Sequence, residues 1–147
     1  MRARNPWLDA GGVLSLIAAI LHLAVIAGGP DWYRFFGAGE EMARMAEQGS
    51  PLPALVTLGI AAILAIWAAF AFSGAGRIRR LPLLRTALVA ISTIYLVRGL
   101  LIVPVLLQEQ PRSFDIWSSA IVLVYGLAYA IGTAQAWRDL TPEESVA

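Results

Sequence analysis

Arg98 lies within an apolar stretch, residues 83–107, whose only other charged side chain is Arg85 near its start. An arginine side chain keeps its charge in proteins, and in the middle of a membrane helix it costs ~2.5–3.5 kcal/mol on insertion scales. Such a residue therefore faces a partner or a water-filled cavity. Its planar fork of donors suits a carboxylate, a phosphate or a quinone oxygen. We take Arg98 as the first candidate for binding a ligand.

His22 is the only histidine of the chain, and the chain contains no cysteine. These two facts exclude bis-histidine haem, thiolate chemistry and cysteine-ligated metal sites. Ser15, Ala18, Ala19 and His22 share one helical face, so His22 is expected on a packing face, as a hydrogen-bonding partner between helices or a proton carrier. The sequence has no recognised spacing for a metal site or an activated nucleophile, and we predict no metal, cofactor or catalytic residue.

Several polar side chains are predicted at a similar depth to Arg98. At the rise of an α-helix, His22, Arg98 and Tyr125 lie ~10–13 Å below the outer membrane boundary. Tyr95 is one turn from Arg98, and an aromatic, acidic connector precedes the second apolar run. The predicted ligand-binding residues are Arg98, His22, Tyr125, Tyr95, Glu40, Glu41 and Trp32.

Four apolar stretches must position these residues. Hydrophobic residues make up 59% of the 147 residues and charged residues 14%, against ~45–50% and ~25% in soluble domains. Backbone amides in lipid must be satisfied within each segment, so runs of spanning length are helices. We predict an all-α, integral membrane four-helix bundle forming one domain, residues 1–147, with spans at about 11–29, 52–72, 83–107 and 116–137.

The connector between the first two spans is the longest. Two acidic residues at the start of residues 39–48, and the four-residue spacing of Glu40 and Arg44, predict a short helix there. Met42, Met45 and Ala46 share one face of this helix. It is interpreted as an interfacial anchor or as a lid over the mouth of the bundle.

Arginine placement predicts the orientation. Seven arginines fall on the side of the termini and three on the opposite side, and basic residues favour the cytoplasm. We expect both termini in the cytoplasm and the chain in the inner membrane of a bacterium. The seven are Arg2, Arg4, Arg77, Arg79, Arg80, Arg85 and Arg138, and the three are Arg34, Arg44 and Arg112.

Small residues and one proline predict how the helices pack. Rows spaced by four residues, which let membrane helices approach closely, occur in the second and fourth spans. Pro104 cannot donate to the Leu100 carbonyl, so we predict a kink about one turn beyond Arg98. The rows are Ala61, Ala65 and Ala69, and Gly126, Ala130 and Ala134.

Three functions remain open from the sequence. The first is binding of an amphiphile with an anionic or strongly accepting head, of lipid or quinone type, in an outer-half cavity around Arg98. The second is a structural or self-assembling membrane subunit, in which Arg98 and His22 hold helices together. The third is a small membrane enzyme using His22 with Glu40 or Glu41, although a non-enzyme is favoured. The expected partners are membrane lipids and a second copy or partner subunit. A net charge of +1 gives no basis for nucleic-acid binding.

Overall fold

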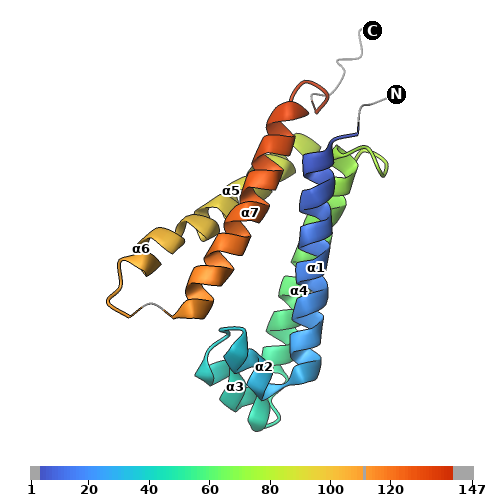
Figure 1. Ribbon diagram of the computed structural model, residues 1–147. Coiled ribbons are helices and arrows are strands. Elements are labelled where there is room, and N and C mark those ends of the chain that lie inside the picture. Colours follow the sequence, from blue (N-terminus) through green and yellow to red (C-terminus); the bar gives the residue numbers. More distant parts are fainter. Residues whose placement is uncertain (1–3, 111, 141–147) are drawn as a thin grey trace.

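The computed structural model describes residues 4–110 and 112–140 and is entirely α-helical between its turns (Figure 1). Four segments are long and apolar enough to cross a membrane, and the segment Leu84–Leu106 consists of two helices. Arg2 and residues 141–147 lie outside the described residues. The protein is a four-helix bundle of candidate membrane spans, with a short helix pair between the first two. The helices are α1 (Pro6–Gly28), α2 (Pro30–Phe35), α3 (Glu40–Glu47), α4 (Leu52–Gly74), α5 (Leu84–Leu100), α6 (Ile102–Leu106) and α7 (Ser113–Gln135).

The first helix begins five residues before its predicted start. The Asn5 side chain accepts hydrogen bonds from the backbone amides of Trp7 and Leu8, both at 3.1 Å, and Pro6 occupies the first turn. Both features stabilise a helix N-terminus. Asn5 Nδ2 also donates to the Gly132 carbonyl at 2.8 Å. The polar head therefore belongs to the helix and ties α1 to α7.

The long helices associate as two pairs, α1 with α4 and α5 with α7, and the pairs meet where α1 contacts α7 and α4 contacts α5. Glycines set the closest approach of α5 and α7. A Cβ added at Gly99 would lie 2.6 Å from Leu123 Cα, and one at Gly126 would lie 2.8 Å from the Leu96 nitrogen. No larger side chain fits at either position unless the backbones move apart.

Both predicted small-residue rows are only partly buried. Ala61 is buried whereas Ala65 is exposed, and Gly126 is buried whereas Ala134 is exposed. A step of four residues overshoots a full helical turn by ~40°, so each row drifts off the interface. Between residues 57 and 71 the buried positions of α4 instead alternate steps of four and three residues: Thr57, Ala61, Leu64, Ala68 and Ala71.

The predicted interruption of the third span is confirmed. α5 ends at Leu100 and α6 begins at Ile102, four and two residues before the proline whose missing amide leaves the Leu100 carbonyl without its helical donor. Beyond this break, α6 leans away from α1 and α4 (Figure 1).

The first connector contains two helices where one was predicted. α3 matches the predicted helix at 39–48, whereas α2 was not predicted; it starts at Pro30, a residue favoured in the first turn of helices. Buried Tyr33 and Ala43 pack with Val25 of α1. The connector therefore extends the end of the bundle.

Arg34 joins the two connector helices. Its guanidinium donates to Glu40 at 2.9 Å and to Glu47 at 2.7 Å. This hydrogen bond from Arg34 lowers the pKa of Glu40 below its ordinary value. Arg44 pairs with Glu41, three residues before it, and not with Glu40, whose spacing from Arg44 helped to predict this helix.

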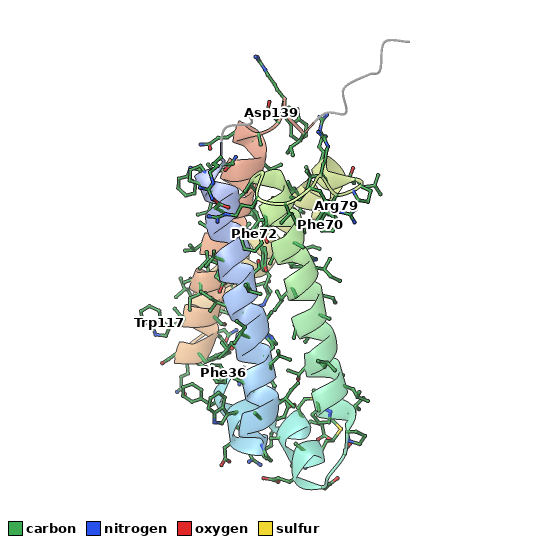
Figure 2. All side chains as sticks on the ribbon, turned by 90° about the vertical axis from the view of Figure 1, so that its right-hand side faces the viewer. Phe36, Phe70, Phe72, Arg79, Trp117 and Asp139 are labelled. Atoms are coloured by element: carbon green, nitrogen blue, oxygen red, sulfur yellow. The ribbon has the colours of Figure 1, made fainter. Side chains whose placement is uncertain are left out.

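Polar side chains also fasten the opposite end, where both termini lie (Figure 1). Arg77, after α4, forms an ion pair with Asp9 of α1. Arg80 donates to the carbonyls of Asp139 and Leu140 after α7. Figure 2 places Arg79 and Asp139 at this same end. We call it the termini end, and the end that carries α2 and α3 the connector end.

Gly99→Ala is expected to destabilise the protein by ~1–3 kcal/mol, because the new methyl group would press on the Leu123 backbone. The free energy of unfolding in mixed detergent micelles measures the effect. Gly59→Ala is the control, since Gly59 lies within α4 and a Cβ there meets nothing within 4 Å. Gly59→Ala should be neutral or stabilising by up to ~1 kcal/mol. Equal effects of the two changes would contradict the close approach of α5 and α7.

Arg34→Gln should speed amide hydrogen exchange in residues 30–48, because α2 and α3 lose the side chain that joins them. Arg44→Gln is the control, since its partner Glu41 lies on the same helix. In the unmodified protein the protection should persist at neutral pH and fall as the pH drops through the lowered pKa of Glu40. Protection that is unaltered by Arg34→Gln would exclude this role.

Candidate functional site

The Arg98 guanidinium has a polar partner on the neighbouring helix. Arg98 Nη1 donates to the hydroxyl of Ser119 on α7 at 3.1 Å, and Ser119 is 1% exposed. A guanidinium carries five N–H donors. None of the ion pairs within residues 4–110 and 112–140 includes Arg98. A neutral hydroxyl therefore meets this cation, and no carboxylate of the described chain neutralises it.

The two carboxylates predicted near Arg98 are engaged elsewhere. Glu40 accepts from Arg34 and Glu41 from Arg44, all within the connector. The structure thus places both carboxylates on connector arginines and does not bring them to Arg98. In these contacts neither glutamate neutralises the Arg98 charge.

His22 forms its hydrogen bond within its own helix. Its Nδ1 lies 2.7 Å from the Ala18 carbonyl, and because a carbonyl only accepts, Nδ1 carries the hydrogen of this bond. The half-buried imidazole therefore does not act as the predicted link between helices. Its use with Glu40 or Glu41 in catalysis stays a prediction. Within the described part of the chain, no three histidine, aspartate or glutamate residues are grouped so that they could hold a metal ion.

Tyr95 and Tyr125 belong to a polar and aromatic cluster at the centre of the bundle. Ser15 Oγ lies 2.9 Å from the hydroxyls of both Tyr95 and Tyr129. Tyr129 also donates to the Trp67 carbonyl at 3.0 Å. The ring of Tyr95 packs edge-on against those of Trp67 and Tyr125, with centroids 4.9 and 5.5 Å away. This cluster draws residues from α1, α4, α5 and α7, and its tyrosines are core residues before they are ligand contacts.

Trp32 packs within the connector end of the molecule. Its ring centroid lies 5.6 Å from that of Phe36. A Cβ added at Gly28 would lie 2.2 Å from Cγ of the Trp32 ring. The connector reaches α7 through Gly37, where an added Cβ would come 2.4 Å from the Phe114 ring. Phe114 precedes Ser119 by ~7.5 Å along the helix. Contact between the connector and the helix that holds Ser119 is thus present, although no contact places Trp32 at Arg98.

Sequence reasoning missed two residues of this region. A fourth span that starts at residue 116, as predicted, would put Ser119 near the membrane surface, whereas α7 begins at Ser113. Ser15 was assigned to a packing face only; the available signal was a hydroxyl on that face in a chain with two tyrosine-bearing spans. Two hollows of the structure lie at the termini end, and none of the predicted ligand residues lines either of them. Figure 2 shows Trp117, 69% exposed, pointing away from the helices, as suits a lipid-facing ring.

Comparisons of the chain with protein-family models, with curated proteins and with solved structures found no match. Its function has to be inferred from its own residues and contacts.

Ser15→Ala should destabilise the bundle by ~1–3 kcal/mol, because the buried Tyr95 hydroxyl loses its partner. Unfolding in detergent measures the loss. Ser92→Ala is a matched control: Ser92 is also buried, but its hydroxyl bonds the Leu88 carbonyl of its own helix. An effect of Ser15→Ala no larger than that of Ser92→Ala would show that the cluster contributes little to the association of the helices.

Proposed function

We propose that this small polytopic membrane protein binds an amphiphile with an anionic or strongly accepting head, of lipid or quinone type, at Arg98. The observation that carries the proposal is the unneutralised guanidinium: a single serine hydroxyl is its hydrogen-bond partner among the described residues. A charge held at the depth of a membrane span calls for a counter-charge or water. A ligand head with acceptor oxygens would supply the remaining hydrogen bonds.

The charges of the connector favour a ligand that arrives through the membrane. Residues 30–50 contain four carboxylates and two arginines. This negative balance disfavours the approach of a water-soluble anion through the connector. An amphiphile already dissolved in the bilayer reaches a lateral opening between helices without passing these carboxylates.

Other residues of the outer half complete the proposed site. Ser119 would orient the guanidinium, leaving its remaining donors for the ligand. His22 would present Nε2 as a further polar atom on α1, and the connector would cover the site through its contact with Phe114. In this proposal Tyr95 and Tyr125 form the inner wall.

The orientation is part of the same proposal. Arg77, Arg79 and Arg80 lie between α4 and α5 at the termini end, with Arg138 after α7. The positive-inside rule then places both termini in the cytoplasm of a bacterium and the Arg98 site in the outer half of the inner membrane.

A structural role is a second candidate, and the Arg98–Ser119 hydrogen bond favours it. This bond joins α5 to α7 next to the close approach at Gly99, and polar side chains hold membrane helices together in this way. In that case the protein would act as an accessory or self-assembling subunit, and its exposed apolar faces would meet other chains.

Arg98→Leu is expected to abolish binding of the amphiphile, because the cation that grips its head is removed. The measurement is native mass spectrometry after incubation with a fatty acid, phosphatidylglycerol and ubiquinone, each added separately, so that the three arms identify the head that is recognised. Arg112→Leu is the matched control, since Arg112 is an exposed arginine that pairs with Asp115. Arg98→Lys should retain part of the binding to an anionic head.

Two outcomes distinguish the candidates. If Arg98→Leu and Ser119→Ala lower the stability of the bundle equally and leave the occupancy by all three amphiphiles unaltered, the binding function is excluded. If Ser119→Ala leaves occupancy within about twofold while Arg98→Leu removes it, Arg98 acts on the ligand and not only through the bond to α7.

A further inference from the structure

A groove of about 870 Å³ lies between α5 and α7 at the termini end. This volume is within the ~300–1,000 Å³ of small-molecule sites. Val89 and Thr93 line it on α5, and Ala130, Thr133 and Ala134 line it on α7. The groove exists because α5 and α7 touch closely at Gly99 and Gly126, while the small-residue row of α7 has drifted out of the contact beyond that point.

One hydroxyl in this groove lacks a partner. Ser92 and Thr93 donate to the Leu88 and Val89 carbonyls of their own helix, at 2.7 and 2.9 Å. Thr133 is 4% exposed, and its Oγ1 has no hydrogen-bond partner among the described residues. Buried hydroxyls are normally satisfied, often by the carbonyl four residues earlier. An acceptor brought by a ligand would satisfy Thr133.

The rim of the groove carries charge and an aromatic ring. Gln135, Trp137, Arg138 and Asp139 line it where α7 ends. Arg85 of α5 holds its guanidinium carbon 3.5 Å from the centroid of the Trp137 ring. Tryptophan and arginine at the end of a span are typical of the headgroup layer. The groove thus runs from this layer into the apolar part of the spans.

We propose that this groove binds one anionic phospholipid, with its phosphate at Thr133, Gln135 and Arg138 and an acyl chain along Val89 and Ala130. The groove opens on the side of membrane-spanning helices, where lipid is the surrounding solvent. The arginines of the termini end complement a phosphate. Asp139 suits a headgroup that also carries hydroxyl donors, such as that of phosphatidylglycerol. This site is separate from that of Arg98, whose guanidinium binds Ser119, on the connector side of the close approach of Gly99 to Leu123.

Filling the groove tests where the lipid sits. In an Arg98→Leu background, which removes the other proposed site, Ala134→Leu should lower the fraction of protein carrying phosphatidylglycerol in native mass spectrometry by about tenfold, the factor that corresponds to ~1.4 kcal/mol. Ala65→Leu is the matched control, because Ala65 is an exposed alanine of α4 outside the groove. Equal phosphatidylglycerol occupancy in the two variants would overturn the proposal. Loss of a protein oligomer without loss of lipid in Ala134→Leu would also overturn it, because a second chain would then fill the groove.

Removing charge and the hydroxyl tests the headgroup contact. With equal amounts of phosphatidylglycerol and phosphatidylcholine, Arg138→Gln should lower the preference for phosphatidylglycerol about fivefold, near the ~1 kcal/mol expected of one basic residue at an anionic surface. Arg79→Gln removes the same charge at the same end, outside the groove, and should have a smaller effect. Thr133→Val, of similar shape, should weaken binding of both lipids. Equal effects of the two arginine changes, or full binding by Thr133→Val, would contradict the site. Unaltered groove occupancy in Arg98→Leu would show that the groove and the Arg98 site are independent.

Discussion

The hydroxyl of Ser15 connects all four long helices of this protein. It lies within hydrogen-bonding distance of Tyr95 on α5 and Tyr129 on α7, and Tyr129 extends the network to the backbone of α4 at Trp67. Helices in lipid gain little from hiding apolar side chains against one another, so close packing and such hydrogen bonds hold them together. The two helix pairs, α1 with α4 and α5 with α7, are joined at their centre by this cluster.

The two ends of the bundle are held together by different contacts. At the termini end, Asn5, Arg77 and Arg80 tie separate segments together through hydrogen bonds and an ion pair. At the connector end, Arg34 holds α2 to α3, while α6 leans away after the break before Pro104. The groove between α5 and α7 therefore lies on the termini side of a fixed middle, where these two helices cross at their glycines.

Properties of single segments could be predicted from the sequence, and contacts between segments could not. The four apolar runs and the interruption near Pro104 follow from length, hydropathy and a missing amide, which belong to each segment alone. The partner of Arg98 depends on where α7 begins and on how closely it crosses α5, so Ser119 could not be identified. The row ending at Ala134 was predicted as an interface because spacing by four ignores the drift of such a row around the helix. The ion pairs of the connector could not be predicted either, because they depend on a contact between segments: Arg34 of α2 lies beside Glu40 of α3.

Two arginines of this chain show why a cation can be left without a protein carboxylate. Arg34 sits at an exposed end, where Asp31, Glu40 and Glu47 surround it at little desolvation cost. A carboxylate beside Arg98 would have to move out of water into a membrane span. Taking an ion out of water into a protein interior costs roughly several kcal/mol per ion. The neutral hydroxyl of Ser119 avoids a second charge within the span but leaves the exposed guanidinium of Arg98 without a counter-charge. An amphiphile resolves this conflict, because its chain is already in the membrane and its head brings the acceptor only when it is bound.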